Sequence, residues 1–197
     1  MSPFRPPWPP PASPARGPWP ARRRWAPWDH EHPGLWPPPD DRPGDLNDDP
    51  SPRWLDRVAA AVRARLAELR LPSVVGHADW ESQNLRWDGE RPLAVHDWDS
   101  AVAQPEAVVA GLASAVWPAT GGPGEAATVE QSEQFLTAYA QARGRLWTDP
   151  ERQACWAAGL WVRAFNAKKE RMEGGGPQLD RLATEAPERS SRAGLDV

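Results

Sequence analysis

Apolar residues recur every three or four positions between residues 55 and 69, which predicts an amphipathic helix. The residues of this stripe are Leu55, Val58, Val62, Leu66 and Leu69. Ser51 can cap the helix, because its side chain accepts a free backbone N–H. Pro52 suits the first helical position, where no N–H is needed. We expect the helix to end near Arg70, before Pro72.

Short apolar runs follow Pro72 and predict a small β region. Val74-Val75 forms one candidate strand, residues 85–87 a second and residues 93–96 a third. Asp88-Gly89 is a turn signal between the second and third strands. These two strands should therefore pair as an antiparallel hairpin.

The rest of the chain has helical periodicity, over about 106–117, 129–143 and 151–172. Thr128 and Gln131 have capping-box spacing, and Gly144 is placed to end that helix. Asp149-Pro150 should begin the last long helix, and three glycines at 174–176 should end it. The pattern predicts an α-rich α+β fold with a short hairpin.

Composition divides the chain, because 17 of its 25 prolines lie in residues 1–52. Proline at this density opposes both helices and central strands. We therefore expect residues 1–50 to form a Pro/Trp-rich segment that is disordered or strapped along the surface, residues 51–176 to form the folded domain, and residues 177–197 to form a helical or frayed tail. A Pro-rich segment can also bind an aromatic groove of a partner.

Charge and cysteine content exclude several classes of protein. The formal net charge of −4 argues against nucleic-acid binding. One cysteine excludes a disulfide framework and a cysteine-based zinc cluster. The longest apolar run, residues 107–117, is too short to span a membrane, and no signal-peptide core follows Met1. We expect a cytoplasmic protein with no nucleic-acid or membrane partner.

Candidate chemistry is concentrated around the predicted hairpin. Asp79 follows a predicted strand, and Asn84 lies five residues later, where the chain enters the next strand. Pairing of the hairpin strands should bring Asp97 beside Asn84. Two carboxylates and an amide oxygen are ligands suited to Mg²⁺, which also binds phosphates.

The spacing His77-x-Asp79-x4-Asn84, followed by Asp97-Trp98-Asp99, resembles the catalytic loop and metal-binding segment of the aminoglycoside phosphotransferase and choline-kinase-like family. The resemblance covers about residues 50–175. It implies the C-terminal lobe of a protein-kinase-like fold that uses ATP and Mg²⁺.

The same resemblance implies a role for each matching residue. Asp79 would be the catalytic base toward a hydroxyl group of a small molecule. Asn84 and Asp97 would bind Mg²⁺, Asp99 would support them, and His77 would brace the loop. The acceptor is left open, since aminoglycoside, choline, homoserine and sugar kinases share these residues. The acceptor pocket is expected near helices 106–165.

The sequence departs from the family pattern at several positions. Ala78 replaces the usual glycine, and Glu81 and Gln83 stand where histidine and glycine are common. Residues 103–105 (Ala-Gln-Pro) replace the family's Gly-Asp-Pro. These differences affect the substrate side more than the metal ligands.

A larger departure lies upstream of the loop. The only lysines are Lys168 and Lys169, so no lysine precedes His77 to clamp ATP. By the family resemblance we expect a C-terminal lobe with most of the N-terminal lobe absent, through truncation, a mis-called start or degeneration. We expect negligible kinase activity from residues 1–197 alone, and self-association through the exposed face between the lobes. The alternative is a non-catalytic binding or regulatory module that keeps the C-lobe scaffold.

Overall fold

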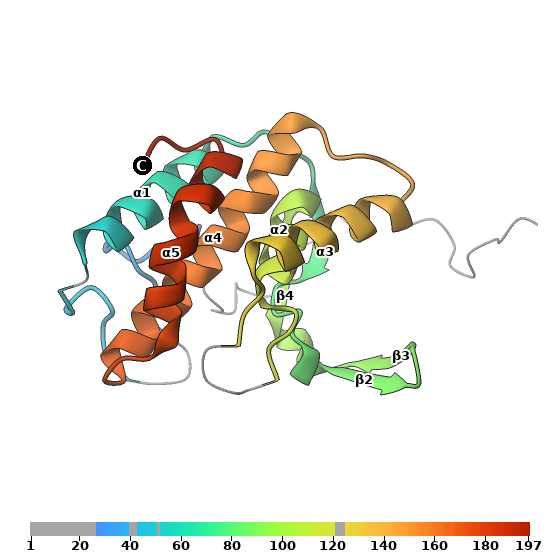
Figure 1. Cartoon of the computed structure of the whole chain (residues 1–197), viewed down its shortest axis with the longest axis horizontal. Helices are drawn as coiled ribbons and strands as arrows, with labels where there is room; N and C mark the ends of the chain where they lie inside the picture. Colours follow the sequence, from blue (N-terminus) through green and yellow to red (C-terminus); the bar gives the residue numbers. More distant parts are fainter. Residues whose placement is uncertain (1–26, 40–42, 51, 121–124) are drawn as a thin grey trace, which may run out of the picture.

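The computed structural model describes residues 27–39, 43–50, 52–120 and 125–197. These residues form five α-helices and two small antiparallel sheets (Figure 1), so the predicted α+β composition is confirmed. The elements in chain order are α1 (Arg53–Ala67), β1 (Ser73–His77), β2 (Leu85–Asp88), β3 (Arg91–Val95), β4 (Ala101–Pro105), α2 (Glu106–Val116), α3 (Val129–Ala142), α4 (Asp149–Met172) and α5 (Pro177–Arg192).

Helix α4 is the centre of the molecule and packs against α1, α2 and α5. Every residue from Ala154 to Phe165 is buried, so this helix is covered on all sides. Its contact with α2 is very close, because a Cβ added at Gly111 would lie 2.2 Å from the carbonyl oxygen of Cys155. Only glycine allows the two helix backbones to approach so closely.

The β structure consists of two separate pairs of strands. Strand β1 pairs with β4, so that Val74 lies opposite Gln104 and His77 opposite Ala101. Strands β2 and β3 form the predicted hairpin, which extends away from the helices (Figure 1). The prediction missed β4, because Ala-Val-Ala-Gln-Pro has neither clear alternation nor β-branched enrichment.

Several predicted helix ends need correction. Pro52 precedes α1 in an extended conformation (ψ 128°) instead of occupying its first turn, and Ser51 lies outside the described residues. Helix α1 ends at Ala67, three residues before Arg70. The capping box of Thr128 and Gln131 is present, and Gly144 follows α3 with φ +72°.

The Pro/Trp-rich segment contributes to the core, although a disordered or surface-strapped segment was expected. Trp36 and Leu46 are fully buried, and the ring of Trp36 stacks on Trp161 at 5.6 Å between centroids. The Trp36 Nε1–H group donates a hydrogen bond to Asp56 at 3.0 Å. The described part of residues 1–50 is therefore integrated into the fold, and residues 1–26 lie outside the described range.

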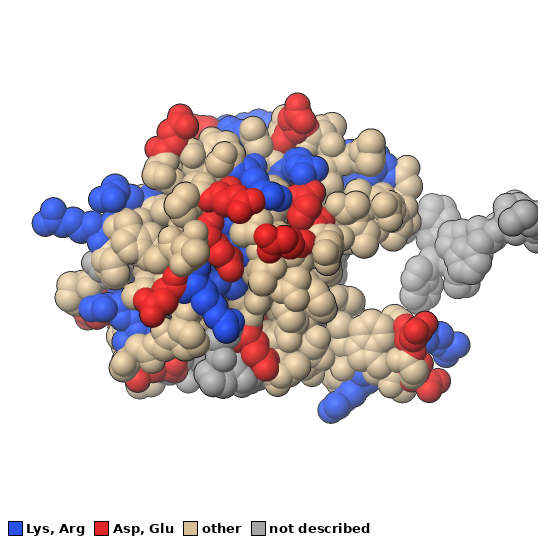
Figure 2. Space-filling model, in the orientation of Figure 1, with Lys and Arg blue, Asp and Glu red and all other residues tan. Residues whose placement is uncertain are grey.

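The C-terminal helix α5 also packs on α4, through Leu182 and Ala186. Charged side chains of both signs are interleaved on the face shown in Figure 2. Among the ion pairs of the described residues, Arg192 bridges Glu133 and Glu188. None of the described helices combines the length and apolar character needed to cross a membrane.

Replacing Trp36 by alanine tests the role of the N-terminal segment. We expect Trp36→Ala to lower the free energy of unfolding by about 3–5 kcal/mol, because it leaves a cavity beside Trp161. Urea unfolding followed by circular dichroism measures the change. Trp87→Ala is the control, since Trp87 is half exposed and should change stability by less than about 0.5 kcal/mol. Equal effects of the two substitutions would contradict the packing of this segment.

Alanine substitution of Gly111 and of Gly159, which lie between α2 and α4, should lower stability to different extents. Gly111→Ala brings a methyl group against the backbone of α4 and should cost more than about 3 kcal/mol, despite alanine's better helix propensity. Gly159→Ala meets the Gly111 carbonyl oxygen at 3.0 Å and should cost less. Thermal unfolding of both variants checks this order, and the reverse order would count against the close contact.

Candidate functional site

The candidate site is a loop between β1 and β2 that is held by hydrogen bonds at both ends. His77 ends β1, and Ala78 donates its N–H to the carbonyl oxygen of Ser100 at 3.0 Å. At the other end, Asn84 accepts a backbone hydrogen bond from His96 at 2.8 Å. The loop is thereby attached to the segment that carries Asp97.

The C-terminal end of α2 supports the middle of the loop. Ser82 donates both its N–H (3.0 Å) and its hydroxyl (2.8 Å) to the carbonyl oxygen of Trp117. The N–H of Gln83 reaches the carbonyl oxygen of Ala119 at 3.1 Å. These bonds satisfy carbonyl groups that a helix end leaves without partners, and they fix the loop relative to the helical core.

His77 connects the two strands through its ring. Its Nδ1 atom accepts the N–H of Asp79 at 3.2 Å, so Nε2 carries the proton and donates it to the carbonyl oxygen of His96 at 2.8 Å. The rings of Trp80 and Trp98 meet the His77 ring edge-on, at 6.0 and 5.3 Å between centroids. His77 therefore orients the backbone around Asp79.

Asp79 and Asn84 lie in direct contact. The Asn84 Nδ2 group donates to both the carbonyl oxygen and the Oδ2 atom of Asp79, each at 3.0 Å. Asp79 is buried, with 7% of its surface exposed. The five-residue spacing thus forms a closed loop in which the amide of Asn84 holds the carboxylate of Asp79.

Asp97 lies in a strained position near this pair. It is the only non-glycine residue of the described chain with a positive φ (62°), a conformation that aspartate tolerates better than most residues. The pKa of Asp97 is raised by a hydrogen bond between the side chains of Asp97 and Asp99, and further by burial and by the negative charges of Asp99 and Asp79. Three carboxylates therefore repel one another here, which a bound cation would relieve.

The donor set fits a hard cation. Asp79, Asp97 and Asp99 offer carboxylate oxygens, and Asn84 keeps its Oδ1 atom after its Nδ2 group has bonded to Asp79. Within the described residues, no three His, Cys, Asp or Glu side chains are arranged closely enough to hold a metal ion by themselves.

Glu81 is a further ionisable group on the loop whose interactions the sequence did not reveal. Burial and the charge of Asp79 raise the pKa of Glu81 to about 7, while Gln83 and the charge of Lys169 oppose this shift. The only sequence feature that singled out Glu81 was its position, where the family commonly has histidine. Trp87 and Trp98, near the loop, are more than half exposed.

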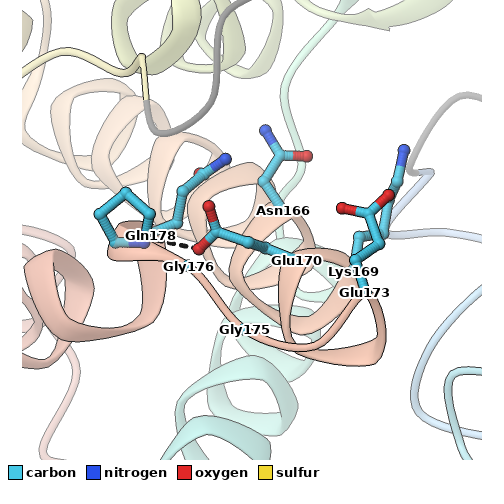
Figure 3. Close-up of a pocket in the computed structure, with 8 residues that line it drawn as sticks. Asn166, Lys169, Glu170, Glu173, Gly175, Gly176 and Gln178 are labelled. Carbon is cyan, nitrogen blue, oxygen red and sulfur yellow. Dashed lines mark hydrogen bonds between the residues drawn. The ribbon is translucent and has the colours of Figure 1, made fainter.

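A pocket of about 390 Å³ lies beyond the predicted helices 106–165, between the end of α4 and the start of α5. Asn166, Lys169 and Gln178 are among the residues that line it (Figure 3).

A model of the phosphotransferase enzyme family matches residues 6–149. The chain therefore belongs to the phosphotransferase enzyme family. The match begins well upstream of the predicted limit of about residue 50 and ends where α4 begins. No curated protein sequence and no solved structure matches the chain significantly.

The raised pKa of Glu81 gives a pH-dependent stability. Because ionisation is less favourable in the folded state, Glu81 contributes stability below its unfolded pKa of about 4.5 and loses it as pH rises through about 7. Glu81→Gln should be more stable than the wild type by about 1–3 kcal/mol at pH 8 and equal to it at pH 4. Urea unfolding at both pH values measures this difference, and a gain at pH 4 alone would contradict it.

Proposed function

We propose that the chain binds ATP with Mg²⁺ and transfers the γ-phosphoryl group to a hydroxyl group of a small molecule. The contact between Asp79 and Asn84, with Asp97 following directly after His96, whose N–H donates to Asn84, is the observation that carries this proposal. Membership of the phosphotransferase enzyme family supports it. The fold that this function implies is the C-terminal lobe of a protein-kinase-like enzyme.

We assign a separate role to each polar residue of the loop. Asp79 would accept or orient the proton of the acceptor hydroxyl, since its carboxylate is buried and held by Asn84. Asn84 and Asp97 would hold Mg²⁺, with Asp99 as a supporting carboxylate. The bound Mg²⁺ would offset negative charge on the phosphates.

His77 acts through the backbone, because both ring nitrogens are engaged in hydrogen bonds to the loop and to His96. A neutral ring with this tautomer keeps the N–H of Asp79 and the carbonyl of His96 at a fixed separation. Replacing it should alter the position of Asp79 without removing any group that contacts the substrate.

Binding tests the metal site independently of turnover. We expect Mg²⁺-dependent ATP binding, measured by calorimetry, to weaken at least about tenfold in Asp97→Asn and Asn84→Ala, because each removes an oxygen ligand. Asp88→Asn is the matched control, since Asp88 is exposed at the tip of the hairpin and should bind ATP normally. ATP binding that is unaffected by Mg²⁺ and by Asp97→Asn would refute the assignment of these ligands.

Turnover tests the proposed base. We expect slow phosphoryl transfer from Mg·ATP to a panel of hydroxyl compounds that includes aminoglycosides and choline, because no lysine precedes the loop to hold the phosphates. Asp79→Asn should reduce the measured rate by a factor on the order of 100 or more. A rate near that of ordinary kinases, on the order of one per second, would show that another group supplies the phosphate contact.

A further inference from the structure

The small sheet of β1 and β4 has one face that the described residues leave largely exposed. The two faces can be told apart, because alternate residues of a strand point to opposite sides. Gly76 faces α2, since an added Cβ would lie 2.6 Å from a methyl group of Val109. Val75 therefore points away from α2, and 54% of its surface is exposed. Ala103, its partner on β4, is also exposed.

This surface continues onto the segment that follows the hairpin. His77 lies on the same side of β1 as Val75, and the ring of Trp98 packs edge-on against it at 5.3 Å between centroids. Trp98 itself is 58% exposed. We call the surface formed by Val75, Ala103 and Trp98 the open face. Apolar side chains grouped on an exposed surface are typical of an interaction site.

The charge beside the open face is negative. Asp97 and Asp99 flank Trp98 in the chain, and Asp79 follows His77 by two residues. No lysine or arginine occurs in residues 73–85 or 92–105, which carry β1, the loop and β4. An occupant of the open face should therefore combine apolar side chains with positive charge.

The first 26 residues of the chain have this complementary composition. They contain five arginines, three tryptophans and nine prolines, and neither aspartate nor glutamate. Proline-rich stretches can bind exposed aromatic surfaces through their side chains, without the main-chain donors that proline lacks. Residues 1–26 thus match the open face both in apolar character and in the sign of their charge.

The described part of the chain also begins beside this sheet. Gln104 of β4 donates a hydrogen bond to Oδ2 of Asp29 at 2.9 Å, and Arg63 of α1 donates to the carbonyl oxygen of Trp28 at 2.8 Å. An extended chain covers about 3.3 Å per residue, so about five residues suffice to run the length of β4. Residues 1–26 are therefore attached close to the open face and are long enough to cross it.

We infer that the open face binds residues 1–26 of the same chain. The tryptophans of this segment cover Val75 and Trp98, and its arginines pair with the neighbouring carboxylates. A second copy of the chain fits less well, because it carries the same acidic groups and a net charge of −4. Attachment gives the segment an effective concentration on the order of 1 mM at the face. This intramolecular contact does not depend on phosphoryl transfer.

Thiol reactivity of Ala103→Cys in the full chain tests the contact, because residue 103 is exposed on the open face and the native Cys155 is buried. The comparison is the same full chain that also carries Trp8→Ser, Trp19→Ser and Trp25→Ser. Loss of the tryptophans should raise the rate of reaction with a maleimide at least about tenfold, since the segment no longer covers the thiol. Equal rates in the two chains would overturn the inference.

Ala183→Cys is the matched control, since Ala183 is exposed on α5, away from the open face. The three tryptophan substitutions should leave the rate at this position unchanged. A similar acceleration at both positions would show a general loosening of the fold and would count against the contact. A melting temperature equal to that of the wild type shows that each variant is folded.

A second variant tests the charge pairing. Arg22→Gln, Arg23→Gln and Arg24→Gln together should raise the rate at residue 103 about threefold in dilute buffer, and this difference should disappear in about 1 M salt, where charges are screened. The absence of any effect in dilute buffer would refute the pairing with the carboxylates.

Dilution distinguishes the segment from a second copy. Protection of residue 103 by its own chain does not depend on protein concentration, so the rate constant should be the same at low and high concentration. A rate constant that rises on dilution, together with a dimer in sedimentation, would assign the open face to a second copy and overturn the inference.

Discussion

The backbone contact between α2 and α4 at Gly111 is the constraint on which the candidate site depends. Without a side chain at this position, α2 lies directly against the carbonyl of Cys155. The end of α2 then supplies the carbonyl groups of Trp117 and Ala119, which hold Ser82 and Gln83. A wider separation of the helices would move these carbonyls, and the loop that carries Asp79 would lose its support. The position of the loop that carries Asp79 thus depends on Gly111, which is distant from it in sequence.

The sequence predicted the local features well, because short-range patterns determine them. The capping box at Thr128, the hairpin and the approach of the Asp97 segment to Asn84 all follow from spacing within about 15 residues. The prediction missed β4, since its pairing with β1 is decided by tertiary contact and not by its own composition. The burial of Trp36 was missed for the same reason, because a proline-rich segment gives no periodicity from which packing can be inferred.

The candidate site shows the same division between spacing and environment. The spacing of Asp79 and Asn84 predicts that both lie on this loop. Their mutual hydrogen bond, and the two hydrogen bonds of the His77 ring to Asp79 and His96, are visible only in the folded structure. The interactions of Glu81 could not be foreseen, because the groups that shift its pKa include Lys169, 88 positions away along the chain. The pocket at Gln178 likewise forms only where α4 turns into α5.

Charged side chains near the end of helix α4 connect it to the N-terminal segment. Lys168 is almost fully buried and donates to the carbonyl oxygen of Asp49, and Arg171 pairs with the carboxylate of the same residue at 3.0 Å. Burying a cation is costly unless it is hydrogen-bonded, so these contacts tie the N-terminal segment to the last turns of α4. The neighbouring Lys169 faces the pocket instead. Adjacent lysines on one helix therefore contact different parts of the molecule: Lys168 binds the N-terminal segment that contains Trp36, and Lys169 lines the pocket between α4 and α5.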